Sequence, residues 1–224
     1  SFNSGSSALL AACHAAQLKP FDRLITTPNT FVATVASALH FGVDPLFVDI
    51  DRKTGNMDLN EVELNIHFES SRGRNIYMPV HFAGIPVDIE RLNSMITDPE
   101  ALIIEDAAHA IGSSYADGQK VGSCTSSQMT IFSFHPSKTM TTGEGGMVTT
   151  NDEEYARRLR LFRNNGLERD AQYLKGQPAP WYYEVKEISN NTHMTEIQAA
   201  LGLSQLSRLD TFVEKRRHLW KRYQ

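Results

Sequence analysis

The chain has 224 residues and a formal net charge of −4, because 26 Asp and Glu outnumber 22 Lys and Arg. That acidic balance argues against a nucleic-acid-binding protein. Hydrophobic residues make up 41% of the chain and charged residues 21%, so the chain can bury a sizeable core and global disorder is not expected. One folded domain, or one and a half, is expected from this length.

The two cysteines, Cys13 and Cys124, lie far apart and form no CxxC pair. This usage fits a reducing compartment, and a cytoplasmic location is expected. The longest weakly polar run, at 32–43, is too short to span a bilayer, so no membrane helix is expected. Residue 1 is Ser and the last residues form a basic helical pattern, from which we expect a fragment of a longer protein.

Helical and extended patterns alternate along the chain. In order, they predict a helix at 6–18, a strand at 23–27, a helix capped by Asn29 or Thr30 and ended by Gly42, a strand at 45–50 and a helix at 58–66. There follow a strand at 75–80, a helix at 88–96, strands at 102–105 and 129–134, a helix at 152–164, a loop or lid at 167–183, and helices at 195–208 and 210–223. Such alternation is typical of an α/β domain with a mostly parallel sheet, helices on both faces, and ligands at the carboxyl ends of the strands.

Several familiar ligand motifs are absent from the sequence. The glycine-rich run at 143–146 has the wrong spacing for GxGxxG, and no GxxxxGK[ST] occurs. The eight histidines form no HExxH pair and have no cysteine partners at zinc spacing. No metal site is therefore predicted.

Residues 3–7, with the sequence Asn-Ser-Gly-Ser-Ser, open the first predicted helix. The free N–H groups and the positive dipole end of a helix favour an anion such as phosphate, and Gly5 would allow it to approach closely. The alternative is an ordinary helix cap.

A second feature is the apolar run that ends in Glu105 and Asp106, with His109 three positions further on. A carboxylate at the carboxyl tip of a strand lies where ligands of such sheets bind. The alternative is a helix cap at Asp106, with His109 satisfied within the fold.

A third feature is Lys138, which follows a predicted buried strand and precedes the glycine-rich turn at 141–146. Loss of solvent at this place would lower the pKa of the amine and leave a nucleophile. The alternative is a solvated surface charge.

A phosphate cradle, a strand-end carboxylate and a loop lysine are the parts that a pyridoxal phosphate enzyme needs. The sequence resembles the DegT/StrS-type sugar aminotransferases, which are fold-type I pyridoxal phosphate enzymes. The resemblance rests on five ordered segments: NSGSSAL at 3–9 (phosphate loop), TFVAT at 30–34 (ring stacking), EDAAHA at 105–110 (pyridine nitrogen), FSFHPSK at 132–138 with TTGEGG at 141–146 (Schiff-base loop), and MTEIQAALG at 194–202 (late helix).

The resemblance implies chemical roles for three residues. Lys138 would hold the cofactor covalently and, once released, would move the proton between substrate and cofactor as general acid and base. Asp106 would pair with the pyridine nitrogen and keep it protonated, and His109 would donate a hydrogen bond to the phenolic oxygen.

It also implies binding roles for five others. Phe31 would stack on the cofactor ring, and Gly5, Ser6 and Ser133 would bind the phosphate. Asn191 matches an asparagine that reaches the cofactor phosphate of the neighbouring subunit, which implies a homodimer with shared active sites.

The implied fold is the large domain of a fold-type I pyridoxal-phosphate-dependent transferase, with a mostly parallel sheet of the seven-stranded type between helices. Residues 1–188 would form the central part of this domain, and 189–224 would be helices that lead toward a truncated small C-terminal domain. The family commonly has Arg where this chain has His193, which removes a permanent positive charge near the expected phosphates.

The implied reaction moves an amino group from glutamate to a keto nucleotide-sugar, in amino-sugar and surface-polysaccharide biosynthesis. PWYYE at 180–184 and LGLSQL at 201–206 are similar to transaminases of the pseudaminic acid pathway. This implies a UDP-linked 4-keto-6-deoxy-N-acetylhexosamine as substrate. The charge balance and the short apolar runs predict no nucleic-acid or membrane partner.

Three alternatives stay open. Sugar dehydratases of the same fold replace the lysine by His, so Lys138 argues against them. The second alternative is a catalytically silent regulatory protein of this fold, which His193 and the truncation support. A nucleotide-binding doubly wound protein without pyridoxal phosphate would need a glycine fingerprint that the sequence lacks.

Overall fold

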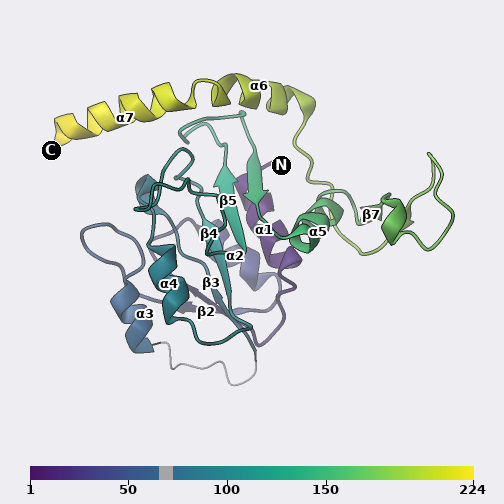
Figure 1. The fold of residues 1–224 in the computed structure, drawn as a ribbon, viewed down its shortest axis with the longest axis horizontal. Helices are drawn as coiled ribbons and strands as arrows, with labels where there is room; N and C mark the ends of the chain where they lie inside the picture. The colour runs from purple at the N-terminus through teal and green to yellow at the C-terminus, as the bar shows by residue number, and fades with distance from the viewer. Residues whose placement is uncertain (66–72) are drawn as a thin grey trace.

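The computed structural model describes residues 1–65 and 73–224, and Figure 1 shows their arrangement. Its α-helices are α1 (Gly5–Ala15), α2 (Val32–Leu39), α3 (Leu59–Asn65), α4 (Ile89–Met95), α5 (Glu153–Arg163), α6 (Glu196–Leu206) and α7 (Leu209–Tyr223). Its strands are β1 (Arg23–Thr26), β2 (Asp44–Phe47), β3 (Asn75–Tyr77), β4 (Leu102–Asp106), β5 (Met129–Ser133), β6 (Gly146–Thr149), β7 (Leu167–Glu168) and β8 (Glu184–Val185). Short 3₁₀ turns lie at Phe82–Gly84 and Ala171–Tyr173.

The central sheet has six strands in the order β2-β1-β3-β4-β5-β6. Its first five strands are parallel, and β6 pairs antiparallel with β5. The predicted α/β fold with a mostly parallel sheet is confirmed. The resemblance implies a sheet of the seven-stranded type, and the described residues supply six of its strands.

Helices cover both faces of this sheet, because successive side chains of a strand point to opposite sides. On β4, Ile104 belongs to the core under α1, α2 and α5, whereas its neighbour Ile103 belongs to the core under α3 and α4. Leu24 and Ile25 of β1 divide between the two cores in the same way. Strands buried on both faces give continuous apolar runs, which explains why these segments could be recognised in the sequence.

Most predicted helices and strands are present with ends displaced by a few residues. The predicted cap of the second helix is wrong: α2 begins after Phe31 and has no side-chain cap. Asn29 donates instead to the Gly55 carbonyl at 2.9 Å, and Thr30 pairs with the Thr34 hydroxyl at 2.7 Å. The last position of the helix predicted at 58–66 lies outside the described residues.

Strand β6 was not predicted, because it begins at Gly146 inside the glycine-rich turn. Gly146 exchanges backbone hydrogen bonds of 2.8 and 2.9 Å with Phe2, so the start of the chain is tied to this edge of the sheet. A Cβ at Gly146 would lie 2.3 Å from the Ser4 carbonyl oxygen. Only glycine allows this approach, which places the first turn of α1 beside the end of β5.

The last two helices form one long arm along the side of the molecule, drawn in yellow in Figure 1. Packing contacts hold the arm against the domain: Gly202 of α6 packs against Thr142, and Leu209 of α7 joins a core cluster with Ala107 and Phe134. Both contacts involve the loops at the carboxyl ends of β4 and β5. Among the described residues, no helix has the length and apolar character needed to cross a membrane.

Candidate active site

A cavity of about 410 Å³ lies where the carboxyl ends of β4 and β5 meet the first turn of α1. Seven of the predicted site residues line it: Gly5, Ser6, Phe31, Asp106, His109, Ser133 and Lys138. Asn191 does not line it. Residues from four separate segments therefore meet at the sheet edge where the topology predicts a ligand.

The first turn of α1 forms one wall of the cavity. The Ser4 hydroxyl accepts the Ser7 N–H at 3.1 Å and caps the helix, so the helix-cap alternative holds for Ser4. The N–H groups of Gly5 and Ser6 have no carbonyl to bond within a helix that starts here. A Cβ at Gly5 would lie 2.8 Å from the Ser133 Cβ, so glycine lets the Ser133 hydroxyl stand beside these N–H groups. Such a cradle is suited to a phosphate.

Asp106 is the last residue of β4, and it is 4% exposed. One carboxylate oxygen, Oδ2, accepts the Thr34 hydroxyl at 2.7 Å, and Oδ1 accepts the Ala108 N–H at 3.1 Å. The chain turns at Ala108 and His109 instead of entering a helix, so the helix-cap alternative for Asp106 is wrong. The carboxylate is held in a fixed orientation at the cavity wall.

His109 is oriented by the neighbouring turn. The Ala83 N–H donates to its Nδ1 at 3.3 Å, so in the neutral ring the proton lies on Nε2. Burial and the charge of Lys138 lower the pKa of His109, against the opposing effect of Asp106. The geometry therefore makes His109 a neutral hydrogen-bond donor through Nε2.

Lys138 lies in the loop after β5. Its backbone N–H donates to the His135 carbonyl at 2.9 Å, and its backbone carbonyl accepts a hydrogen bond from the Arg216 side chain of α7 at 3.3 Å. Burial lowers the pKa of the Lys138 amine, while the Asp106 carboxylate opposes this effect. A larger fraction of the amine is therefore neutral, which is the form that attacks a carbonyl carbon.

Phe31 lines the cavity, whereas Asn191 lies outside it. Phe31 is the residue before α2, and its side chain is 72% exposed at the cavity. Asn191 is exposed and pairs through its backbone with Asn164, away from the cavity. His193 Nε2 lies 3.0 Å from the Asn164 side-chain oxygen, and burial together with Arg163 lowers the pKa of His193. Both effects disfavour a positive charge on His193.

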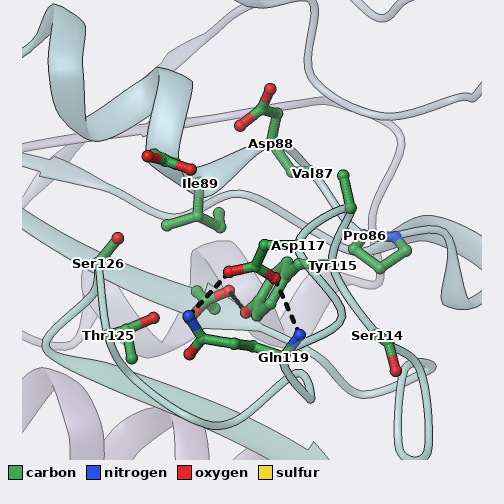
Figure 2. Close-up of a pocket in the computed structure, with 13 residues that line it drawn as sticks. Pro86, Val87, Asp88, Ile89, Ser114, Tyr115, Asp117, Gln119, Thr125 and Ser126 are labelled. Atoms are coloured by element: carbon green, nitrogen blue, oxygen red, sulfur yellow. Dashed lines mark hydrogen bonds between the residues drawn. The ribbon is translucent and has the colours of Figure 1, made fainter.

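Glu105, the other carboxylate of the β4 motif, lies on the opposite face of the sheet. It is 1% exposed and accepts hydrogen bonds from His81 at 2.8 Å, Tyr115 at 2.5 Å, Thr130 at 2.7 Å and Ser127. Burial alone would raise its pKa, but the donors from His81, Ser127 and Tyr115 outweigh burial and lower the pKa. Figure 2 shows Tyr115 in the pocket on that side, which is separate from the candidate active site.

Sequence reasoning missed Thr34 as a partner of Asp106. Thr30 and Thr34 are one helical turn apart, and their hydroxyls are 2.7 Å apart, but nothing in that spacing shows that Thr34 reaches a residue 72 positions away. His135, Ser137 and Glu144 also line the cavity without having been assigned a role. Their place in the lysine loop was the available signal.

The fold and the site together define a large domain of the fold-type I class, and comparison with known proteins gives the family. The whole chain, residues 1–224, matches the DegT/DnrJ/EryC1/StrS aminotransferase family. The chain belongs to this family, as the sequence motifs predicted.

Two relatives show what the family contains. The chain is 37% identical over 218 residues to the UDP-4-amino-4,6-dideoxy-N-acetyl-beta-L-altrosamine transaminase of Helicobacter pylori, covering 96% of this chain and 54% of that protein. It is also 37% identical over 214 residues to the GDP-perosamine synthase of Caulobacter vibrioides, covering 96% of this chain and 53% of that protein. The relatives thus include a transaminase of the predicted branch, and a protein that is named for a different sugar has the same sequence identity to this chain.

A solved structure extends the comparison to the fold. The putative sugar aminotransferase Spr1654 of Streptococcus pneumoniae, in its PMP-form, superposes with a TM-score of 0.85 at 29% identity, covering 99% of this chain and 59% of that one. The same protein has been solved in a PLP-form, so the predicted cofactor is confirmed at the level of the family. The chain spans about half the length of the relatives it matches.

Proposed function

We propose that the chain is the cofactor-binding part of an aminotransferase that uses pyridoxal phosphate to move an amino group onto a keto nucleotide-sugar. The observation that carries the proposal is the meeting of Lys138, Asp106 and the first turn of α1 in one cavity. The cavity offers N–H donors for a phosphate, a carboxylate for a pyridine nitrogen and an amine for an aldehyde carbon. Family membership supports the reaction class.

The donor set of the cavity fits the phosphate end of the cofactor. Gly5 and Ser6 would bind the phosphate through N–H groups, and Ser133 through its hydroxyl, at the positive end of α1. The closeness of Gly5 to Ser133 leaves no room for a side chain between them. The cradle is thus formed before any ligand arrives.

The remaining residues fit the ring. Asp106, held by Thr34, would pair with the ring nitrogen, and Phe31 would cover one ring face. His109 would donate from Nε2 to the phenolic oxygen, because its Nδ1 is already engaged by the Ala83 N–H. When bound, pyridoxal phosphate supplies an electron sink for the carbon from which a proton is removed.

Lys138 would act in two ways. Its amine would hold the cofactor covalently and, after release by the amino donor, would carry the proton as general base and then as general acid. The lowered pKa of the amine supports both roles, because a base works best with a pKa near the working pH.

We further propose glutamate as the amino donor and a UDP-linked 4-keto-6-deoxy-N-acetylhexosamine as the acceptor. The support is the similarity of 180–184 and 201–206 to pseudaminic acid pathway transaminases, and the relative from Helicobacter pylori that is named for the altrosamine sugar. Turnover of a GDP-linked ketone in place of the UDP-linked one would move the chain to the perosamine branch.

The active site would be completed by a second copy of the chain. Asn191 is exposed and lies outside the cavity of its own chain, as a residue that reaches the partner's phosphate would. In this proposal residues 1–188 form the large domain and 189–224 lead to the small one. The buried free thiols of Cys13 and Cys124 fit the predicted cytoplasmic location.

The test follows the visible absorbance of the lysine–cofactor bond. Pyridoxal phosphate is added to the protein and to Lys138→Ala, and glutamate is then supplied. We expect a band in the unchanged protein alone, and glutamate should bleach it as the cofactor takes up the amino group. A band of equal strength in Lys138→Ala would contradict the assignment of the lysine.

One alternative is favoured by a specific observation. His193 stands where the family commonly has Arg, which removes a permanent positive charge, so a catalytically silent regulatory protein that keeps the cofactor is the second candidate. It predicts that Lys138→Ala leaves the biological effect of the protein intact. A sugar dehydratase would instead release water and take up no nitrogen, which product analysis distinguishes.

A further inference from the structure

A cavity of about 470 Å³ lies between α5 and residues 167–173, which contain β7 and the second 3₁₀ turn. We call it the α5 cavity. Figure 1 shows β7 beside α5, and β7 belongs to a small sheet separate from the central one. The α5 cavity is larger than the cavity at the candidate active site, and the two share no lining residue. The proposed function therefore assigns no role to it.

Four arginines line the α5 cavity, and one of them is neutralised by carboxylates. Arg157 donates to Glu154 at 2.8 and 2.9 Å and to Glu168 at 3.3 Å. The other three form no ion pair with any residue that the structure describes: Arg160, Arg163 and Arg169. A concave surface that gathers unpaired charges of one sign attracts ligands of the opposite sign.

The carboxylates that line the α5 cavity are committed elsewhere. Glu168 is 6% exposed, and its Oε1 accepts the backbone N–H groups of the next two residues at 3.0 Å each, while its Oε2 accepts from Arg157. The two oxygens of Asp170 accept from the backbone and the side chain of Gln172, at 3.2 and 2.9 Å. Glu153 is the first residue of α5, at the opposite end of the helix from the unpaired arginines. These carboxylates leave a positive charge in the cavity.

Arg163 gives the most specific indication of a ligand. Its Nε is buried and has no hydrogen-bond partner among the described residues, and its Nη1 donates to the Ser1 carbonyl at 3.4 Å. A buried N–H group normally has an acceptor. Burial and the neighbouring charge of Arg160 lower the pKa of Arg163, so the fold holds two like charges close together. An anion between them would remove both costs.

The simplest alternative is that these arginines offset the dipole of α5. Basic side chains in the last turn of a helix interact favourably with its negative end, and this explanation is sufficient for the exposed Arg160. It does not explain the unbonded Nε of Arg163. It does not explain Arg169 either, which comes from the segment after β7 and lies with its guanidinium carbon 5.1 Å from the centre of the Tyr183 ring. Unpaired guanidinium groups from two segments therefore converge on one cavity.

We propose that the α5 cavity binds a phosphate-type dianion, either inorganic phosphate or the phosphate group of a small organic molecule. Arg160 and Arg163 are one helical turn apart on the same side of α5, and Arg169 contributes from the other wall. Arginine forks bind phosphate oxygens in pairs, which gives each of these side chains a suitable acceptor.

Asn164 connects the proposed site to a neighbouring segment. It lines the α5 cavity, its side-chain oxygen lies 3.0 Å from His193 Nε2, and its backbone pairs with Asn191. A dianion in the cavity would thus contact, through Asn164, the segment that carries Asn191 and His193.

The test uses inorganic phosphate and the Nε–H nuclear magnetic resonance signals of the arginines in isotopically labelled protein, at constant ionic strength. Because each signal belongs to one residue, binding at the α5 cavity is distinguished from binding at the first turn of α1. We expect the signals of Arg160 and Arg163 to shift together and to reach saturation.

Two variants make the test specific, with the Arg163 signal as the reporter in both. Arg160→Gln should weaken phosphate binding by about tenfold or more, the loss typical of a charged hydrogen bond. Arg208→Gln is the matched control, because it removes an exposed guanidinium that does not line the cavity. It should change the dissociation constant by less than about twofold.

The proposal is overturned if phosphate shifts neither signal, if sodium chloride at the same ionic strength shifts them equally, or if the two variants bind phosphate alike. Glycerol 3-phosphate separates the two sources of the dianion: tighter binding than that of inorganic phosphate assigns an organic phosphate, and equal or weaker binding assigns the free ion. The lysine–cofactor band is measured independently at the other cavity, so failure of this proposal leaves the proposed function standing.

Discussion

Glu105 and Asp106 are adjacent carboxylates on one strand, and the structure uses them in opposite ways. Glu105 points to the side of α3 and α4, where four side chains donate to its two oxygens. Asp106 points to the cavity side, where one hydroxyl and one backbone N–H hold it and Lys138 lies nearby. A saturated carboxylate stabilises the fold, whereas one with unused hydrogen-bonding capacity can bind a ligand.

The tautomer of His81 shows how completely Glu105 is satisfied. The Val87 N–H donates to His81 Nδ1 at 3.0 Å, so the ring proton lies on Nε2 and is donated to Glu105 at 2.8 Å. Both ring nitrogens are engaged inside the fold. His109, by contrast, has one nitrogen engaged by Ala83 and the other available to a ligand.

The largest effect is expected from Lys138→Ala. We expect transaminase activity to fall by about 10²–10⁴-fold, because the nucleophile and the proton carrier are lost together. The midpoint of urea unfolding should stay close to that of the unchanged protein. Steady-state rates and the lysine–cofactor absorbance measure the first effect, and Lys120→Ala on the outer loop is the matched control.

Asp106→Asn should lower the rate by about 10²-fold, because a neutral amide cannot stabilise the protonated ring nitrogen. The free energy of unfolding should change by less than about 1 kcal/mol, because the amide fills the same space and only two donors are affected. A large loss of stability with normal activity per folded molecule would reverse the roles assigned to the two carboxylates.

Glu105→Gln should have the opposite profile. We expect the protein to lose about 2 kcal/mol of stability, because hydrogen bonds to a buried charge are replaced by weaker ones to an amide. Cofactor binding by the folded fraction should be unchanged. Urea unfolding followed by circular dichroism, and cofactor titration at a temperature where the variant is folded, measure the two quantities.

The pH dependence of stability should report on the ionisation of Glu105. The pKa of Glu105 is lowered in the folded state, so its stabilising effect is fully present above the ordinary value of 4.5 and is lost as the pH falls through the folded pKa. Unfolding free energies measured from pH 7 to pH 3 should therefore fall less steeply in Glu105→Gln than in the unchanged protein. Identical slopes would mean that folding leaves the pKa of Glu105 unchanged, which would contradict this account.

Thr34→Val should give the smallest effect. It removes the hydroxyl that donates to Asp106 while keeping the shape of the side chain. We expect cofactor affinity to fall by about fivefold, the effect of one hydrogen bond. Thr150→Val removes a hydroxyl that donates to the Gln128 carbonyl at the amino end of β5, away from the cavity. This control should leave the affinity unchanged.

The sequence allowed the sheet to be predicted because buried parallel strands are short apolar runs between amphipathic helices. It did not reveal β6, whose first residue is a glycine in a turn-like segment. It also gave the wrong cap for α2, because Asn29 is engaged by the distant Gly55 carbonyl. Local patterns report local structure, and these two details depend on tertiary contacts.

The site was predictable to a similar extent. Strand ends and loop motifs indicated Asp106, Lys138 and the first turn of α1, since each lies at the same edge of a parallel sheet. The separation of Glu105 from Asp106 follows from the two-residue period of a strand. The contact of Thr34 with Asp106 and the arginines that converge on the α5 cavity could be seen only in three dimensions.

The most direct test of the central claim is to locate the cofactor chemically. The protein is loaded with pyridoxal phosphate, the lysine–cofactor bond is reduced with borohydride, and peptide mass spectrometry identifies the modified lysine. The account predicts stoichiometric modification of Lys138 alone. Modification spread over surface lysines, with Lys138 unmodified, would contradict it.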